Sequence, residues 1–150
     1  MDKYCDHKSK THTISLEILN LHSDGFHLLV EVFVFNKPFK AVLDTGASRT
    51  VFDKTTVEQY IEQEALLASD KLSTGLGTNS MESHTLTIPE FKIGDLVISY
   101  FETAVLDLSM INTAYESLEV GPVIGVIGGD ILMKHKAVIS YSSLTLSFES

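Results

Sequence analysis

Residues 37–52, KPFKAVLDTGASRTVF, place one carboxylate in a turn of small residues between two apolar segments. The first segment, FKAVL, runs into Asp44, and a second apolar pair, Val51-Phe52, follows the turn. Aspartate is seldom buried without a partner, and it is common in turns. Asp44 is therefore either the capping residue of a turn between two strands or a functional group that these strands hold in place.

The chain before Asp44 has the pattern of three short strands. Residues 13–21 alternate between apolar and polar side chains, as expected of a half-buried strand. Asp24-Gly25 is a hairpin-turn signal, and residues 27–35 are rich in β-branched and aromatic side chains. Asn36-Lys37-Pro38 then predicts a second turn before the apolar segment that leads to Asp44.

The middle of the chain has mixed character. Residues 53–69 predict a short amphipathic helix, with Asp53 as its N-cap and a capping box formed by Thr55 and Glu58. Residues 73–91 are rich in glycine and hydroxyl side chains and then alternate, which favours a mobile hairpin over a core strand. Residues 92–109 return to strand character, and residues 109–122 predict a helical turn or loop of unassigned role.

The last part of the chain predicts a strand, a helix and a hairpin. Val126-Ile127 runs into two glycines, and residues 130–136 have helix-forming composition behind Asp130 as an N-cap. Residues 137–148 predict a hairpin. The expected architecture is all-β with one or two short helices, in a single domain over residues 13–150 that follows a flexible N-terminal tail, residues 1–12.

Length and charge restrict the partners. A chain of 150 residues with 44% hydrophobic content is expected to form one core. Its formal net charge of -9 repels nucleic acid phosphate and anionic lipid, so neither nucleic acid nor membrane is an expected partner. No apolar run reaches the roughly 18 residues of a membrane span, and the charged N-terminus lacks the apolar core of a signal peptide. With Cys5 as the single cysteine, nothing requires an oxidising compartment, and a cytoplasmic location is expected.

No metal or cofactor is expected. Cys5, His7 and His12 could be imagined as metal ligands, but their spacing matches no zinc pattern and a fourth ligand is missing. The remaining histidines share no ligand spacing, so surface or strand positions are the default reading for them. They are His22, His27, His84 and His135.

Three elements in order resemble the retropepsin-like aspartic proteases. The first is the D-T-G-A sequence that begins at Asp44. The second, about 80 residues later, is Val126-Ile127-Gly128, two apolar residues and a glycine that lead into a helix. The third lies between them, where residues 71–90 are the candidate for a flap hairpin with Gly75, Leu76, Gly77 and Thr78 at its tip. The resemblance implies an acid-protease β-barrel that is closed, carries a flap and covers roughly residues 13–150.

The resemblance also implies roles for individual residues. Asp44 would be catalytic, supported by Thr45, Gly46 and Ala47, while Gly46, Ser48 and the flap tip would contact a peptide or protein substrate. Two carboxylates about 3 Å apart cannot both stay ionised, so one can activate water while the other donates a proton to the scissile carbonyl. The sequence contains one D-T-G. A second copy must then supply the second acid, which predicts a homodimer.

Departures from the viral pattern give further expectations. In the viral enzymes an acid usually follows the alanine of the first motif, and an arginine follows the glycine that leads into the helix. Here Ser48-Arg49 follows the alanine and Gly129-Asp130 follows the glycine, so the two charges have exchanged positions. This exchange predicts an ion pair between Arg49 and Asp130. Ala47 offers no hydroxyl to stabilise an ionised carboxylate, so activity is expected to peak at weakly acidic to neutral pH. The C-terminal hairpin argues against dimerisation through interleaved chain ends. Either Gly128 or Gly129 could be the glycine of the apolar-apolar-glycine motif, and Gly128 is preferred because two apolar residues precede it directly.

Two other functions fit parts of the sequence. A peptide-binding or dimerisation module could keep this fold without turnover, because fold does not guarantee chemistry. The acidic segment 53–69 and the segment 109–122 could serve a partner of such a module. A metalloprotein that uses Cys5 and the nearby histidines is a third alternative.

Overall fold

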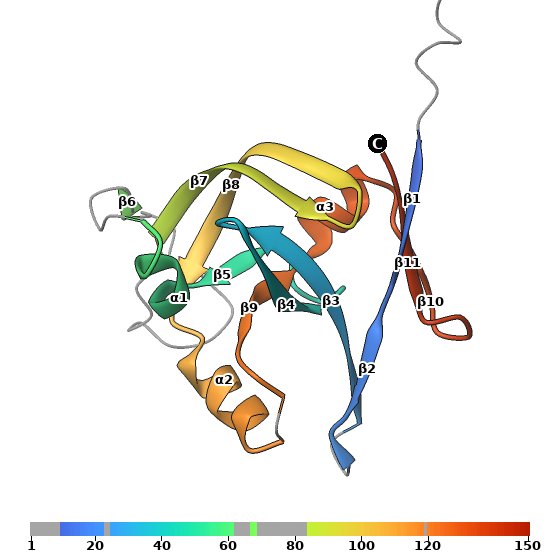
Figure 1. Ribbon diagram of the computed structural model, residues 1–150, viewed down its shortest axis with the longest axis horizontal. Helices are drawn as coiled ribbons and strands as arrows, with labels where there is room; N and C mark the ends of the chain where they lie inside the picture. Colours follow the sequence, from blue (N-terminus) through green and yellow to red (C-terminus); the bar gives the residue numbers. More distant parts are fainter. Residues whose placement is uncertain (1–9, 23–24, 62–66, 69–83, 119) are drawn as a thin grey trace, which may run out of the picture.

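The computed structural model describes residues 10–22, 25–61, 67–68, 84–118 and 120–150 (Figure 1). Strands dominate, and three short helices accompany them in this part of the chain. The elements are β1 (Thr11–Ser15), β2 (Glu17–Asn20), β3 (Phe26–Val34), β4 (Lys37–Leu43), β5 (Val51–Asp53), α1 (Lys54–Glu58), β6 (Leu67–Ala68), β7 (His84–Ile93), β8 (Leu96–Leu106), α2 (Ser109–Glu116), β9 (Val123–Ile127), α3 (Gly129–Lys134), β10 (Val138–Ser140) and β11 (Thr145–Glu149).

A closed barrel forms the body of the molecule. The large sheet has the strand order β2-β3-β4-β9-β5-β8-β7-β6, and an additional pairing of β3 with β7 closes it. The strands β4 and β9 run parallel to each other, as do β5 and β8. The prediction of a mostly β fold with a closed barrel and short helices is therefore confirmed.

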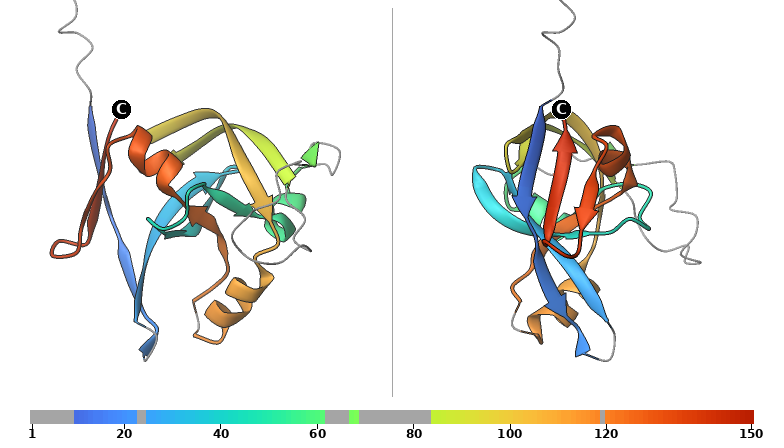
Figure 2. Two further views of the ribbon diagram at one scale, coloured as in Figure 1. Left: turned by 180° about the vertical axis from the view of Figure 1, so that it is seen from behind. Right: turned by 90° about the vertical axis from the view of Figure 1, so that its right-hand side faces the viewer.

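A small second sheet stands beside the barrel, with the order β1-β11-β10 (Figure 2). The predicted C-terminal hairpin is its β10–β11 pair. The first predicted strand is wrong as a single element: it divides into β1, which pairs with β11, and β2, which pairs with β3. Leu16 lies between them, and its N–H donates to the Leu144 carbonyl at 2.8 Å. Alternation continues through this bend, so periodicity alone does not reveal the change of sheet.

The barrel interior is apolar and closely packed. Phe52, Phe91 and Ile127 are among its fully buried side chains, and the rings of Phe52 and Phe91 meet edge to face with centroids 5.7 Å apart. Strand β7 contributes Leu86 and Ile88 to this core, and it pairs with β8 along most of its length. The expectation of a mobile hairpin is thus wrong for residues 84–91, because their alternating apolar side chains face the core. Residues 69–83 lie outside the described residues.

The helices also differ from their predicted extents. Helix α1 spans five residues and begins after Asp53, the predicted N-cap, whose carboxylate accepts a hydrogen bond from the Thr56 N–H at 3.2 Å. Because Asp53 is the cap, the predicted capping box of Thr55 and Glu58 is wrong. The buried Asp53 also accepts from the Leu108 N–H at 2.9 Å, which joins the start of α1 to the end of β8.

The segment 109–122, whose role the sequence left unassigned, contains the helix α2. Asn112 fastens it to the barrel: its side chain donates to the Val123 carbonyl at 3.3 Å and accepts from the Val123 N–H at 2.8 Å. Before the helix, Asp107 accepts a hydrogen bond from the Ser109 N–H, which lowers the pKa of the Asp107 carboxyl. In Figure 1, α2 lies at the same lower end of the molecule as the turn between β2 and β3.

Candidate active site

The turn that carries Asp44 is held by backbone hydrogen bonds. The Asp44 N–H donates to the Ile127 carbonyl at 3.0 Å, which continues the β4–β9 pairing into the turn. The Asp44 Oδ1 accepts from the Gly46 N–H at 2.9 Å, and the Asp44 carbonyl accepts from the Ala47 N–H at 3.2 Å. Thr45, like Asp44 and Gly46, is exposed. The turn thus presents an oriented carboxylate to the surface.

Thr50 and Asp130 support this turn from behind. The fully buried Thr50 donates its hydroxyl to Asp130 Oδ1 at 2.7 Å, and its N–H lies 3.0 Å from both carboxylate oxygens. The same hydroxyl accepts from the Gly128 N–H at 3.0 Å. One threonine therefore links the end of the turn to the start of α3. The Asp130 carboxylate lies within the first turn of α3, and the N-cap is Gly128 rather than the predicted Asp130.

The predicted ion pair between Arg49 and Asp130 is wrong. Asp130 is engaged by Thr50, and the Arg49 guanidinium lies 3.9 Å from the carboxylate of Glu102. Both members of this pair are largely exposed, so it contributes little to stability. The two motifs are therefore joined by hydrogen bonds between Thr50 and Asp130, not by a salt bridge between Arg49 and Asp130.

Gly128 lies in close contact with the Asp44 turn. A Cβ added at Gly128 would lie 2.7 Å from the carbonyl carbon and oxygen of Arg49 and 2.8 Å from the Ala47 carbonyl oxygen. At Gly129 the nearest atom would be the Ala47 oxygen at 3.4 Å. The Gly129 N–H donates to this same oxygen at 2.7 Å. Val126-Ile127-Gly128 thus ends directly against the turn, whereas the flap candidates Gly75, Leu76, Gly77 and Thr78 lie outside the described residues.

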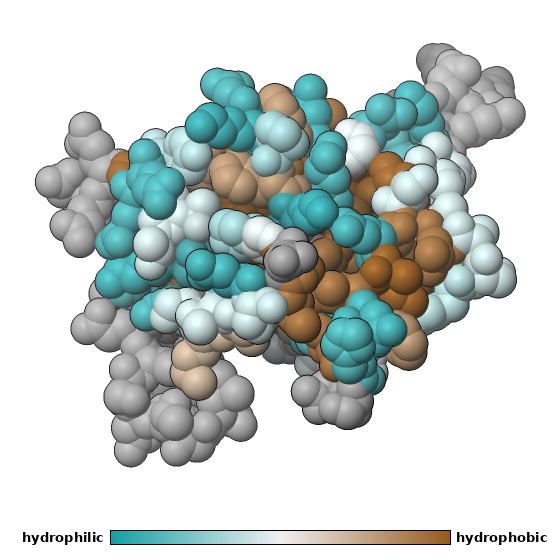
Figure 3. Space-filling view, turned by 60° about the horizontal axis from the view of Figure 1, so that its bottom comes forward, coloured by the Kyte–Doolittle hydropathy of each residue, from teal (hydrophilic) through white to brown (hydrophobic). Residues whose placement is uncertain are grey.

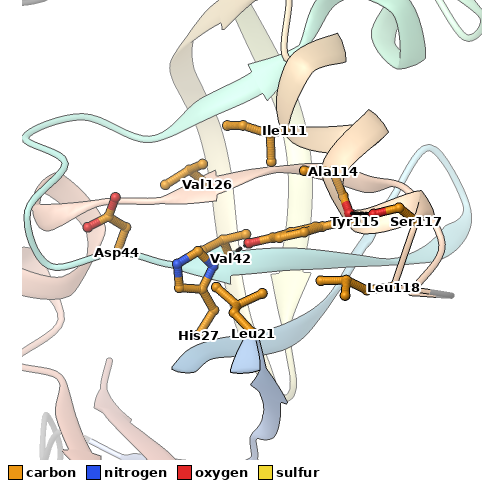
Figure 4. Close-up of a pocket in the computed structure, with 10 residues that line it drawn as sticks. All are labelled: Leu21, His27, Val42, Asp44, Ile111, Ala114, Tyr115, Ser117, Leu118 and Val126. Atoms are coloured by element: carbon orange, nitrogen blue, oxygen red, sulfur yellow. Dashed lines mark hydrogen bonds between the residues drawn. The ribbon is translucent and has the colours of Figure 1, made fainter. Parts of the chain in front are cut away.

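A pocket opens beside Asp44, between the barrel and α2 (Figure 4). Its volume is about 420 Å³, within the range of roughly 300–1,000 Å³ that is common for ligand sites. Most of its wall is apolar, and Asp44 supplies the one carboxylate among the described residues that line it. The lining residues are Leu21, His27, Val42, Asp44, Ile111, Ala114, Tyr115, Ser117, Leu118 and Val126. The corresponding face, which Figure 3 turns forward, carries a continuous apolar area.

His27 and Tyr115 form a polar pair in this pocket. The His27 Nδ1 and the Tyr115 hydroxyl oxygen are 2.6 Å apart, and the rings meet edge to face. Burial raises the pKa of the Tyr115 hydroxyl, and the negative charge of Asp44 adds to this effect. Tyr115 therefore keeps its proton to a higher pH than an ordinary tyrosine.

Sequence reasoning missed this pair, because residue 27 matched the pattern of an ordinary strand histidine and α2 had no assigned role. Thr50 was also missed as a supporting residue. A hydroxyl residue directly before the second apolar pair is a weak signal, and only its contact with Asp130, 80 residues later, identifies its role.

The described residues contain neither a cluster of possible metal ligands nor a helix that could span a membrane. No group of three or more His, Cys, Asp or Glu side chains among them could hold a metal ion. Of the imagined ligands, Cys5 and His7 lie outside the described residues. No described helix is long and apolar enough to cross a membrane.

The replacement of Thr50 by valine tests the support behind the turn. Thr50→Val keeps the shape of the side chain but leaves the Gly128 N–H without its acceptor and removes a donor to Asp130. We expect the free energy of unfolding in urea to fall by about 1–3 kcal/mol. Thr87→Val, the same change at an exposed strand position, should alter it by less than about 0.5 kcal/mol. Equal effects of the two changes would refute the supporting role.

Comparison with known proteins gives a consistent result. The family described as aspartyl protease matches residues 30–131. A retropepsin-like aspartic protease from Rickettsia conorii has a similar structure, with a TM-score of 0.62 and 19% sequence identity, over 100% of this chain and 99% of that chain. No curated protein sequence matches this chain.

Two further solved structures share the fold. The retroviral protease-like domain of Ddi1 from Leishmania major has a TM-score of 0.56 and 18% identity, over 81% of this chain and 87% of that one. The EIAV protease, in complex with the inhibitor HBY-793, has a TM-score of 0.51 and 19% identity, over 71% and 85%. At these identities the similarity concerns the fold.

Proposed function

The chain belongs to the aspartyl protease family, and from this premise we propose that it is an endopeptidase whose catalytic pair consists of Asp44 from each of two identical protomers. The observation that carries the proposal is the exposed, oriented Asp44 carboxylate, the one acidic group among the described residues of a mostly apolar pocket. One carboxylate cannot act as base and acid at once. A two-fold axis through this face would bring the second Asp44 to the first.

The proposed reaction needs no group beyond this pair. The two carboxylates share a proton, because two negative charges about 3 Å apart repel each other strongly. The ionised carboxylate removes a proton from a water molecule, which attacks the scissile carbonyl carbon, while the protonated carboxyl donates to the carbonyl oxygen. The carboxyl that took the proton from water then donates it to the amide nitrogen, and the C–N bond of the tetrahedral intermediate breaks. A hydroxyl of that intermediate returns its proton to the other carboxylate as the new carboxylic acid forms, so the pair again holds one proton. Thr45 is exposed beside Asp44, and we propose that its hydroxyl forms a hydrogen bond to the partner's turn.

Exposed apolar side chains on α2 support contact with a peptide or a second copy beside the pocket. Met110 and Ile111 have exposed fractions of 87% and 36%, whereas the exposed Ile18 and Phe26 share the face of the β2–β3 pair that lies opposite His27. Exposed apolar groups of this size are typical of binding surfaces when they gather at one site. Because the proposed pair of Asp44 side chains can hydrolyse a peptide, we favour cleavage at this surface over binding alone.

The pH dependence of activity provides a test at Ala47. Its methyl group cannot donate a hydrogen bond to an ionised carboxylate, so we expect maximal activity at weakly acidic to neutral pH. A serine hydroxyl there would stabilise the ionised form, so Ala47→Ser should move the acidic limb of the kcat/KM profile to lower pH. A wild-type maximum below about pH 3 would contradict this interpretation, as would an unchanged limb in the variant.

The proposal as a whole is tested by digestion of a mixed peptide library at several protein concentrations, with sedimentation of the same samples. We expect cleavage within peptides, and a specific activity that rises with the dimer fraction and then levels off. Binding of library peptides to a verified dimer without any cleavage would instead establish the non-catalytic binding module.

A further inference from the structure

The hydrogen bond between Tyr115 and His27 determines which nitrogen of the imidazole carries the proton. A neutral imidazole has one N–H donor and one acceptor nitrogen. The buried hydroxyl of Tyr115 keeps its proton, and His27 Nδ1 is the one acceptor that the described residues offer to it. A buried donor without an acceptor is costly, so the Tyr115 O–H donates to Nδ1. In the neutral ring, the proton of His27 therefore lies on Nε2.

The second nitrogen of His27 points toward the catalytic side of the pocket. Figure 4 shows the imidazole between Asp44 and Tyr115, with one nitrogen at the Tyr115 hydroxyl and the other on the side of Asp44. Among the described residues, none forms a hydrogen bond or ion pair with this Nε2 atom. The pocket thus contains an oriented N–H donor next to the carboxylate, and this donor has an open position for a ligand acceptor.

The apolar part of the pocket defines what stands next to that donor. Ile111 and Ala114 from α2, with Leu118 just after its end, face Val42 and Val126 from the barrel, and together they form walls suited to an apolar side chain. A peptide bound at Asp44 with one side chain between these walls has a main-chain carbonyl next to that side chain. This carbonyl is the acceptor group that every peptide substrate supplies.

We propose that His27 is a substrate-binding residue, which donates its Nε2–H to the main-chain carbonyl of the residue whose side chain enters the α2 pocket, and that Tyr115 positions this donor. The proposal rests on the proposed function. It differs from a role of the pair in side-chain selection, because a main-chain contact contributes equally for every peptide. Side-chain selection would come from the apolar walls.

Kinetics with two peptides that differ only in the side chain entering the pocket test the proposal. Tyr115→Phe keeps the ring and removes the hydroxyl, and His27→Leu removes the donor. For both peptides we expect either change to raise KM by about three- to tenfold, with kcat changed less than about twofold. His27→Gln retains an N–H donor and should restore most of the loss. Tyr141→Phe, the same change in an exposed turn, should leave both constants unaltered.

Two measurements separate this proposal from the proteolytic function. Nitrogen-15 NMR of the His27 imidazole should report the Nε2–H tautomer in the wild type and a shift toward a tautomer mixture in Tyr115→Phe. Peptide titration of Asp44→Asn, in which cleavage is blocked, should show the same three- to tenfold weakening on addition of Tyr115→Phe. Both readouts remain valid if no cleavage is ever found.

Several results would overturn the proposal. One is an Nδ1–H tautomer in the wild type, and another is unchanged peptide binding in Tyr115→Phe and His27→Leu. An effect confined to one of the two peptides would assign the pair to side-chain selection instead. A weakened dimer with unchanged KM would place His27 at the interface between protomers.

Discussion

Asp44→Asn is expected to reduce peptide cleavage by at least about 1,000-fold, the largest effect of any single change in this chain. The amide cannot take a proton from water, and in a homodimer the substitution replaces both members of the catalytic pair. The fold should survive, because the Asn side-chain oxygen can still accept from the Gly46 N–H. We expect initial rates to collapse in a peptide-cleavage assay while the circular dichroism spectrum and the thermal midpoint stay close to wild type.

Asp95→Asn is the matched control for this change. Asp95 lies in the exposed turn between β7 and β8, so the same loss of one negative charge occurs away from the pocket. Its activity should equal that of the wild type. If Asp44→Asn retained a substantial fraction of the wild-type rate, Asp44 would not be the catalytic acid and the proposed reaction would be wrong.

Gly128→Ala should have the second largest effect, on stability and activity together. The added methyl group would meet three backbone atoms of residues 47 and 49 at 2.8 Å or less, and backbone cannot rotate away as a side chain can. We expect the free energy of unfolding to fall by about 3 kcal/mol. Because the displaced segment is the Asp44 turn, the remaining folded enzyme should lose about 100-fold in kcat, as expected for a misplacement of about 1 Å.

Two other glycines make this prediction specific. Gly121→Ala adds a methyl group with no atom within 4 Å, and its stability and activity should match the wild type. Gly129→Ala brings its methyl group to 3.4 Å from the Ala47 oxygen, at the first position of α3, and should be tolerated far better than Gly128→Ala. Chemical denaturation with kinetics on the three variants provides the measurement. A greater loss at Gly129 than at Gly128 would reverse the assignment of the motif glycine.

Local sequence patterns predicted the parts of the fold that depend on local chemistry. Asp53 caps α1 as expected, and the antiparallel pairing of β2 with β3 and the C-terminal hairpin follow from short-range signals. The bend at Leu16 was not predictable, because one alternating pattern serves two sheets. The length of α1 was overestimated for a similar reason: helix-forming composition continues past Glu58, where the described helix ends.

The site was predictable only where a motif identifies it. The D-T-G sequence and the apolar-apolar-glycine sequence indicated Asp44 and Gly128, which the fold brings next to each other. The opposite charges of Arg49 and Asp130 led to the wrong prediction of an ion pair. In the structure the hydroxyl of Thr50 donates to Asp130, and Arg49 remains exposed. The His27–Tyr115 contact joins residues 88 positions apart through a helix whose docking depends on Asn112. No local pattern predicts a contact of that kind.

Helix α2 forms one wall of the pocket beside Asp44. It supplies Ile111, Ala114 and Tyr115 to the pocket, and the contact of its Asn112 amide with Val123 fixes it to the strand that reaches Gly128. In the proposed function, substrate side-chain preference and the orientation of His27 would therefore both depend on this helix. The proposed chemistry would depend on the Asp44 turn at the opposite side of the same pocket.

A subunit-mixing experiment tests the shared catalytic pair most directly. Wild-type protein is mixed with an equal amount of Asp44→Asn protein, allowed to exchange subunits, and assayed at a fixed total concentration above the dimer dissociation constant. If each active site needs Asp44 from both protomers, random pairing leaves about one quarter of the dimers active, so activity per total protein should fall to about one quarter. Mixing with Asp95→Asn should cause no loss. A fall to one half in the Asp44→Asn mixture, in proportion to the wild-type content, would mean that each protomer works alone and would contradict the account.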